Sequence, residues 1–272
     1  MTKAIAIAAL AAVLGASWQL PVAHAESATE CTLLQFCYCV NTELNGLIEE
    51  RVAGIRKLLA AQRAQGKVVG YISTPLSSLE GGYFGVNADA AADVKARLEK
   101  QYGADFLWML NPGADHLLPP DASLLPGNAT GADYMWMWTR VLEGPDGLGR
   151  DFDWFYFVGP SDFAATLKLT GADDMRAIDA YYDKRALTDP GIKSIDRNKF
   201  RAYYGLRAAV TYSYGSHDEW NIARAINAKR RVADDKAGFA KQLAIFFDGR
   251  PAPPPLFEEA ITPGDAGACA VK

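Results

Sequence analysis

Short apolar runs alternate with amphipathic segments through the middle of the chain. Three runs are solidly apolar and are each stopped by a turn cluster, which is the pattern of buried strands; they cover residues 68–72, 106–110 and 155–158. Between them, apolar residues recur at spacings of three and four, which predicts helices. Solid strands joined by helices are typical of an open parallel sheet with helices on both faces, so the pattern predicts a Rossmann-like α/β fold.

The segments on either side of this alternation have a different character. The expected organisation is a disulfide-tied segment and a helix at 26–66, the α/β domain at 67–190, a C-terminal helical extension packed on it at 191–248, and a Pro-rich, extended tail at 249–272. We expect residues 26–39 to be irregular. Within the extension, residues 218–231 and 234–247 have the spacing of two helices.

The first residues have the pattern of a secretory signal peptide. Lys3 precedes an almost unbroken apolar run over residues 4–16, which is too short for a membrane-spanning helix and typical of a signal sequence. Ala23-His24-Ala25 matches the small-x-small pattern of a cleavage site. We expect cleavage after Ala25 and a periplasmic or secreted protein, with an uncleaved anchor as the alternative. No later run has the ~18 apolar residues of a membrane span.

Charge and motifs narrow the classes of partner. The chain has 28 basic and 32 acidic residues and no basic cluster, which argues against a nucleic-acid partner. It contains no dinucleotide fingerprint, phosphate-binding loop or Gly-x-Ser-x-Gly elbow, so no cofactor is expected. The expected partner is a small-molecule ligand.

Four cysteines, Cys31, Cys37, Cys39 and Cys269, predict two disulfides in an oxidising compartment. A bond between Cys37 and Cys39 would close a strained ring. We therefore expect Cys269 to pair with one of the other three, and the two cysteines that are left to pair with each other. Zinc binding is the alternative, but a CxC pair without a second CxxC or a nearby His is a poor zinc pattern, and no metal site is expected.

Polar residues follow each of the three expected strands. They are Tyr71, Ser73 and Thr74 at the first, Asn111 at the second, and Ser161 and Asp162 at the third. In an open parallel sheet, ligands bind beyond the carboxyl ends of the strands, so we expect these side chains to converge on one cleft. The alternative interpretation is that each cluster serves only its own turn.

The order of these motifs resembles a known family. Tyr71-Ile-Ser-Thr-Pro-Leu, Leu110-Asn-Pro-Gly, Asp133-Tyr-Met on a helix, and Phe157-Val-Gly-Pro-Ser-Asp162 are similar to the nucleoside 2-deoxyribosyltransferase-like fold, over about residues 67–187. The resemblance implies that Tyr71 or Ser73, together with Asp133 and Asp162, would bind a nucleoside.

The family's nucleophile is a Glu in a Gly-x-x-x-Glu pattern that begins the helix after the third strand. At that place this chain reads Gly171-Ala-Asp-Asp-Met-Arg-Ala-Ile-Asp179, without a Glu. Asp174 or Asp179 would have to substitute, and Asp162 is the third catalytic candidate, as nucleophile or general base.

Two functional hypotheses follow from the sequence. The missing Glu favours a non-catalytic exported protein that binds a ligand or partner. The polar strand ends favour a hydrolase or transferase that acts on the N-glycosidic bond of a nucleoside- or nucleotide-like ligand.

Two further groups of polar residues have a catalytic and a structural interpretation. His217 lies in Ser216-His217-Asp218-Glu219, and we interpret it as part of a helix cap rather than as a catalytic base. The four carboxylates between Glu143 and Asp153 lack the spacing of a calcium-binding loop, so a solvated acidic loop is the preferred interpretation.

Overall fold

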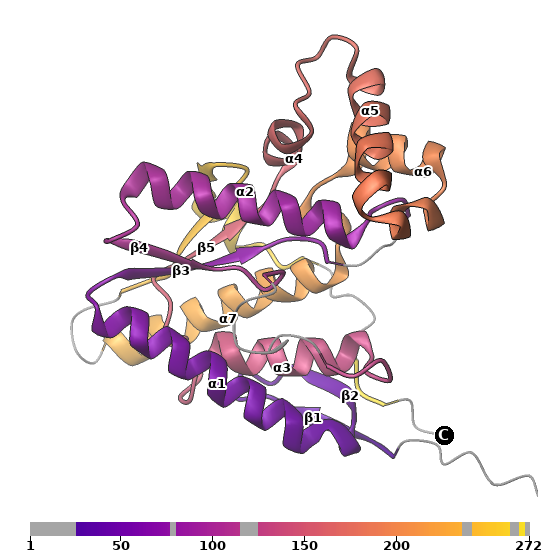
Figure 1. Ribbon diagram of the computed structural model, residues 1–272. Helices are drawn as coiled ribbons and strands as arrows, with labels where there is room; N and C mark the ends of the chain where they lie inside the picture. The colour runs from indigo at the N-terminus through magenta and orange to yellow at the C-terminus, as the bar shows by residue number, and fades with distance from the viewer. Residues whose placement is uncertain (1–25, 77–79, 115–124, 236–240, 262–266, 270–272) are drawn as a thin grey trace, which may run out of the picture.

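The computed structural model describes residues 26–76, 80–114, 125–235, 241–261 and 267–269. The expected signal segment lies outside these ranges. Within them, every helix is too short or too polar to cross a bilayer. The described chain forms a sheet between two layers of helices, with a small hairpin at one side (Figure 1).

The central sheet confirms the predicted α/β class. Its strands are β3 (Val68–Ser73), β4 (Leu107–Leu110), β5 (Trp154–Phe157), β6 (Ala244–Phe247) and β7 (Arg250–Pro251). They lie in the order β4-β3-β5-β6-β7; the first four are parallel, and β7 is antiparallel to β6. All three strands expected from the sequence therefore lie side by side in one sheet.

Helices cover both faces of this sheet. On one side lie α1 (Asn45–Ala64), α3 (Gly131–Glu143) and α7 (Tyr214–Asp235), and on the other lie α2 (Phe84–Tyr102), α4 (Pro160–Leu167), α5 (Asp174–Thr188) and α6 (Arg197–Ala202) (Figure 1). Shorter helical turns are η1 (Thr42–Leu44), η2 (Pro190–Ser194), η3 (Tyr203–Arg207) and η4 (Val210–Tyr212), and α8 (Pro254–Glu258) follows the last strand.

The apolar spacing of α1 explains how these helices attach. Ile48, Val52, Ile55 and Leu59 are all buried, at spacings of four, three and four residues, so they form one stripe facing the core.

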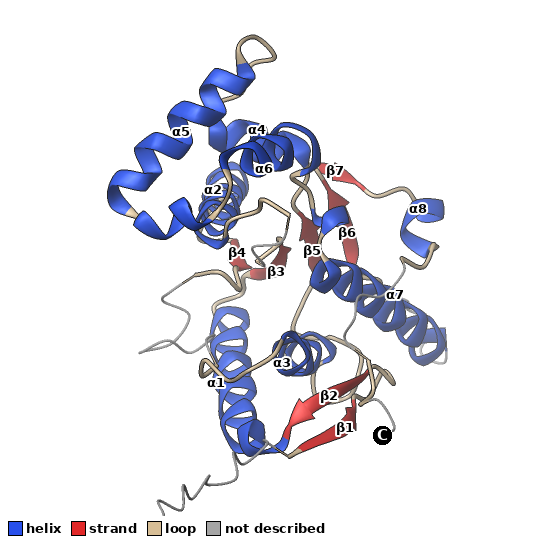
Figure 2. Cartoon of the chain, turned by 90° about the vertical axis from the view of Figure 1, so that its right-hand side faces the viewer, coloured by secondary structure: helices blue, strands red, loops and turns tan. Residues whose placement is uncertain are grey.

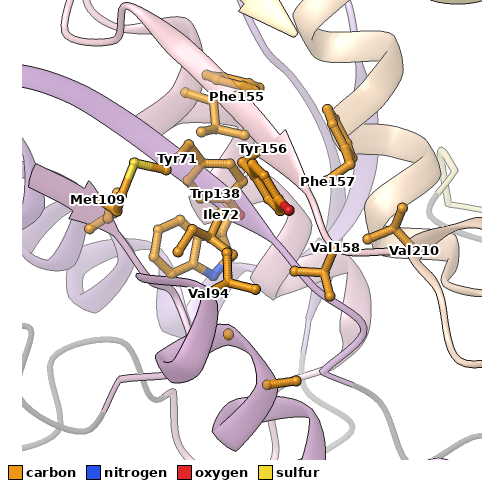
Figure 3. Packing of buried hydrophobic residues seen from close by; sticks show 14 of the residues in the cluster. Tyr71, Ile72, Val94, Met109, Trp138, Phe155, Tyr156, Phe157, Val158 and Val210 are labelled. Atoms are coloured by element: carbon orange, nitrogen blue, oxygen red, sulfur yellow. The ribbon is translucent and has the colours of Figure 1, made fainter. Parts of the chain in front are cut away.

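The core is rich in aromatic side chains: the ring of Tyr71 lies 5.3 Å from that of Phe155, and both are fully buried (Figure 3). The environment around the middle of β3 is consequently apolar.

The N-terminal segment is more regular than the sequence suggested. β1 (Ser27–Cys31) and β2 (Cys37–Asn41) form an antiparallel hairpin, in which Cys31 stands opposite Cys37. Two disulfides join Cys31 to Cys37 and Cys39 to Cys269. The prediction of two bonds, one of them from Cys269 to the N-terminal group, is confirmed, whereas the expectation of an irregular segment at 26–39 is wrong.

The C-terminal part also differs from its prediction. The helix expected over 218–231 is present within α7, but the helix expected over 234–247 is replaced at its end by strand β6. Ala244-Ile-Phe-Phe247 is a run of four apolar residues, which a helix or a strand can use. Here it pairs with β5 and extends the sheet, so the expected helical extension is in part a continuation of the α/β unit.

The strand order creates a switch point between β3 and β5. The chain leaves β3 for β4 on one side and later returns to β5 on the other. The connection after β3 begins with α2, whereas the connection after β5 reaches the other face of the sheet only at α7 (Figure 1). In open parallel sheets, ligands bind beyond the carboxyl ends of the strands at such a switch point. The topology therefore directs attention to the end of β3, at Ser73 and Thr74.

Candidate functional site

A buried tyrosine and a buried glutamate meet beside the switch point. Tyr71, in β3, donates its hydroxyl to Oε1 of Glu219 on α7, at 2.5 Å. The side chain of Tyr71 is inaccessible to solvent and Glu219 is 7% exposed. Trp138 and Phe155 surround the Tyr71 ring at centroid distances of 6.1 and 5.3 Å, so this carboxyl lies next to an aromatic cluster (Figure 3).

The environment of Glu219 changes its acidity. Burial raises the pKa of this carboxyl from 4.5 to about 7, because the charged form loses its hydration. The hydroxyls of Ser73 and Tyr71 lower the pKa in part, and the charge of neighbouring Asp218 raises it. A carboxyl whose pKa is near neutrality exchanges protons at ordinary pH, which is the property that general acids, bases and nucleophiles require.

Several buried polar atoms at the end of β3 and the start of α7 lack a hydrogen bond of ordinary length and angle. They are the hydroxyl oxygens of Ser73, Thr74 and Ser216, and Oε2 of Glu219. Ser73 ends β3 and interacts with Glu219, Thr74 directly follows the strand, and Ser216 lies one helical turn before Glu219 on α7. A buried polar atom without a partner costs about 1–3 kcal/mol, so these atoms are candidates for contact with a polar ligand.

The predicted catalytic residue Asp162 lies on the opposite face of the sheet. Its carboxylate accepts hydrogen bonds from the Tyr156 hydroxyl at 3.0 Å and from the backbone N–H of Gly159 at 3.0 Å. Arg97 of α2 adds an ion pair at 2.6 Å. Burial raises the pKa of Asp162, and these three partners act against that rise. The residue caps the start of α4 and holds α2 to β5.

The other two predicted catalytic residues lie on α5, away from the end of β3. Asp174 accepts the backbone N–H groups of Thr170 and Gly171 at 3.0 and 2.9 Å, which fixes the turn before the helix. Asp179 forms a two-pronged ion pair with Arg201, at 2.7 Å for each contact. The structure gives both residues a contact role and does not bring them to Tyr71.

The predicted binding residues divide into two groups. Tyr71, Ser73 and Thr74 lie together at β3, as described above. Asp133 is buried in the capping box of α3, where it also accepts the Asn41 backbone N–H at 2.7 Å. Two others serve turns: Asn111 accepts the Gly113 N–H at 3.0 Å, and the Ser161 hydroxyl bonds to Asp248 at 2.9 Å.

The remaining candidates from the sequence form hydrogen bonds or ion pairs that hold neighbouring segments together. His217 lies at the start of α7, and its Nε2 bonds to the Thr211 carbonyl at 2.7 Å, so it has a structural contact there. It is not itself the cap, because the Ser213 hydroxyl accepts the first-turn N–H of Ser216 at 3.3 Å.

The expectation of a solvated acidic loop is wrong for Glu143, which is 2% exposed and accepts two backbone N–H groups of the hairpin. Asp153 is also mostly buried and pairs with Lys241 at 2.8 Å. Among the residues that the structure describes, no cluster of three or more His, Cys, Asp or Glu is arranged to hold a metal.

Glu219 is the functional candidate that sequence reasoning missed. The signal was present: Gly215-Ser-His-Asp-Glu219 is a Gly-x-x-x-Glu pattern at the start of a helix. The sequence instead pointed to Gly171, because the helix that carries the pattern is expected directly after the third strand. Helices α4, α5 and α6 separate β5 from α7, so the pattern appears about forty residues further along the chain.

Fold and site together define an α/β protein of doubly wound strand order, with a protonatable carboxyl at the switch point of its sheet. A comparison of the chain with protein-family models, with curated proteins and with solved structures finds no match.

Proposed function

We propose that this protein is an exported enzyme that hydrolyses or transfers the N-glycosidic bond of a nucleoside- or nucleotide-like ligand, with Glu219 as its nucleophile. The observation that carries the proposal is the buried pair of Tyr71 and Glu219 at the carboxyl end of the first parallel strand. A carboxyl with a pKa of about 7 is costly to keep ionised, and functional sites are where such a cost is common.

The order of motifs supports the same proposal. The resemblance to nucleoside 2-deoxyribosyltransferase-like proteins implies an aromatic or polar residue after the first strand and a Glu in Gly-x-x-x-Glu. Tyr71 meets the first requirement and Glu219 of Gly215-Ser-His-Asp-Glu219 meets the second, and the two side chains are in contact. The missing Glu was the reason for favouring a non-catalytic protein, and Glu219 removes that reason.

The proposed chemistry has two displacement steps. The ionised carboxylate of Glu219 attacks the anomeric carbon, and the N-glycosidic bond breaks with its electron pair on the departing base, which takes up a proton. Water, or a second acceptor, then displaces Glu219 from the sugar and restores the carboxylate. Ser73, Thr74 and Ser216 supply hydroxyls that would bond to the sugar, while Tyr71 donates to the carboxylate and favours its ionised form.

The test is release of free base from a panel of purine and pyrimidine nucleosides and nucleotides, followed by chromatography. We expect turnover by the wild-type protein and a loss of at least about a hundredfold in Glu219→Gln, which keeps the size and polarity of the side chain but cannot attack. The rate should rise with pH to a plateau above about 7, because the carboxyl must be ionised.

Glu50→Gln is the matched control, since it makes the same change on the exposed side of α1 and should leave turnover unaltered. Loss of turnover in Asp174→Asn or Asp179→Asn, with Glu219→Gln still active, would move the chemistry to α5 and contradict the proposal. Absence of base release from the whole panel would also contradict it.

A non-catalytic ligand-binding protein is the second candidate, and the burial of Glu219 favours it, because a nucleophile that is 7% exposed is poorly placed to meet a substrate. A thermal-shift screen with the same panel distinguishes the two candidates. A ligand at about 100 times its dissociation constant stabilises the fold by ~2.7 kcal/mol. Stabilisation without base release supports the second candidate, and base release supports the first.

A further inference from the structure

The side chains of α7 hold a stretch of the C-terminal chain by its backbone. Trp220 Nε1 donates to the carbonyl of Glu259 at 3.2 Å. The amide of Asn221 bonds to Ile261 in both directions: it donates to the carbonyl and accepts the backbone N–H, the latter at 3.1 Å. Residues 254–261, which we name the strap, therefore lie along α7 immediately after Glu219 (Figure 2).

Two arginines one and three turns further along α7 continue this contact. Arg224 Nε donates to the Glu258 carbonyl at 2.7 Å, and Arg231 pairs with the Glu258 carboxylate at 3.4 Å. Trp220, Arg224 and Arg231 are spaced by four and seven residues, so they lie on one side of the helix. One face of α7 is thus devoted to the strap.

Burial contributes little to holding the strap in place. Most of its side chains are exposed, including Leu256 at 46%. A groove of about 430 Å³ remains between the strap and α7, lined by Ala225 and Ala228 on the helix and by Phe257 on the strap. Phe257 packs edge-on against Trp220 at a centroid distance of 5.8 Å, and Ile261 is half-buried. The strap is therefore held by two apolar side chains, by a few half-buried or exposed hydrogen bonds and by its covalent anchor.

The anchor is the disulfide between Cys39 and Cys269, eight residues beyond Ile261. Both cysteines are partly exposed, and the backbone N–H of Cys269 bonds to the Thr29 hydroxyl at 3.0 Å. The bond ties the far end of the strap to the N-terminal hairpin. A segment tied at both ends rebinds its surface at a high effective concentration, and cutting one tie removes most of that advantage.

The two disulfides respond differently to reduction. Cys31 and Cys37 face each other in the hairpin and are six residues apart in sequence, so their thiols remain neighbours after reduction and the bond reforms readily. Cys39 and Cys269 are 230 residues apart, and besides the bond itself they are kept together by the strap and by one exposed hydrogen bond from the Cys269 N–H to Thr29. Once reduced, these two thiols separate.

We propose that the strap is a thiol-controlled element: a dithiol reductant opens the Cys39–Cys269 bond, and the strap then leaves the face of α7. The dithiol is oxidised to its own disulfide, and the two electrons and two protons that it gives up convert Cys39 and Cys269 to thiols. Because Trp220 and Asn221 directly follow Glu219, release of the strap loosens the part of α7 that carries the Glu219 carboxyl. This proposal does not rest on the reaction assigned to Glu219, because opening of the bond and release of the strap can be measured without a substrate.

Hydrogen–deuterium exchange of the oxidised protein, before and after treatment with dithiothreitol, tests this proposal. On reduction we expect exchange to accelerate roughly tenfold or more in peptides covering 254–261. A smaller acceleration is expected in 214–224, and none in β3 and β5. Alkylation and mass spectrometry should find Cys39 and Cys269 labelled at lower dithiothreitol than Cys31 and Cys37. Unchanged exchange of 254–261 with both target thiols labelled overturns the proposal, as does labelling in the reverse order.

Variants separate the anchor from general damage to the fold. C39S/C269S should reproduce the effect of reduction, while C31S/C37S removes the other bond and should leave exchange of 254–261 at the wild-type level. Asn221→Ala keeps the anchor and removes two strap contacts, so it provides a test even if C39S/C269S fails to fold. We expect it to accelerate strap exchange far less than reduction does; an equal acceleration would show that the disulfide does not control the strap.

Discussion

Two buried carboxyls, one on each face of the sheet, each accept a hydrogen bond from a tyrosine of a parallel strand, and they differ in their other partners. Asp162, bonded by Tyr156, also has an arginine and a backbone N–H, which offset part of the cost of burying its charge. Glu219, bonded by Tyr71, has one oxygen without a hydrogen bond of ordinary geometry. The exposed fractions of the two residues are similar, so we expect the number of partners, and above all the presence of a cation, to decide which of the two carboxyls stays ionised and which exchanges its proton near neutral pH.

The largest effect is expected when the Asp162 carboxylate is removed. Asp162→Ala leaves the N–H of Gly159 and the Tyr156 hydroxyl buried without an acceptor and Arg97 without its ion pair. We expect the free energy of unfolding, measured with urea, to fall by roughly 3–4 kcal/mol. Asp105→Ala, at an exposed position, should change it by less than about 0.5 kcal/mol. A loss below about 1 kcal/mol for Asp162→Ala would mean that this carboxylate is not the structural member of the comparison.

Substitution of the other carboxyl, that of Glu219, should have the opposite effect and stabilise the protein at pH 8. Because the folded protein raises the pKa of Glu219 from 4.5 to about 7, it binds more protons than the unfolded chain between these values. Its contribution to stability is therefore lost as pH rises through this window, by at most about 3 kcal/mol. Glu219→Gln mimics the protonated form, so it should stabilise the protein by about 2–3 kcal/mol at pH 8 and by little at pH 4.5. Urea unfolding at both pH values measures this, and destabilisation at pH 8 would contradict the pKa assignment.

The smallest changes in the free energy of unfolding are expected when either of the two tyrosines is replaced by phenylalanine. Tyr71→Phe removes the hydroxyl that donates to Glu219, which should cost roughly 1.5 kcal/mol at pH 8 and move the titration of Glu219 above 7, because this hydroxyl lowers its pKa. Tyr156→Phe leaves Asp162 with its arginine and its backbone donor, so about 1 kcal/mol is expected.

A double-mutant cycle isolates the tyrosine–carboxyl interaction. In Tyr71→Phe combined with Glu219→Gln, the cost of losing the tyrosine hydroxyl should shrink, since the charged acceptor is gone. Additive effects of the two substitutions would show that Tyr71 and Glu219 do not interact in solution.

The sequence predicted the sheet well, because three solidly apolar runs with turn clusters have few other interpretations. It failed where local pattern is ambiguous or where tertiary contacts decide. The run at 244–247 is too short to identify itself as a strand, and it becomes one by pairing with β5. The hairpin at 27–41 was obscured by its cysteines, which suggested a tied but irregular segment, although Cys31 and Cys37 stand opposite each other in regular register.

Prediction of the site relied on the order of elements along the chain. It was incomplete because additional helices follow the third strand. Tyr71, Ser73 and Thr74 were found because a strand end is recognisable locally. Glu219 was not, since α4, α5 and α6 lie between the third strand and the helix that returns to the sheet. Asp162 and Asp133 were attractive by position, but whether a carboxylate is free or matched depends on residues such as Arg97 and Asn41, which are distant in sequence.

The bond between Cys39 and Cys269 also sets an order of events during synthesis. Three cysteines lie within the first forty residues, and the fourth is made 230 residues after Cys39, which is a delay of roughly 10–50 s at ordinary rates of translation. Thiols can be oxidised on the scale of seconds, so if the chain is exported during its synthesis, Cys39 meets oxidant before its partner exists. It must wait as a thiol, or enter a bond with Cys31 or Cys37 that exchange later undoes. Of the two disulfides, the Cys39–Cys269 bond is thus the later one to become possible, and maturation of this protein waits for the synthesis of Cys269.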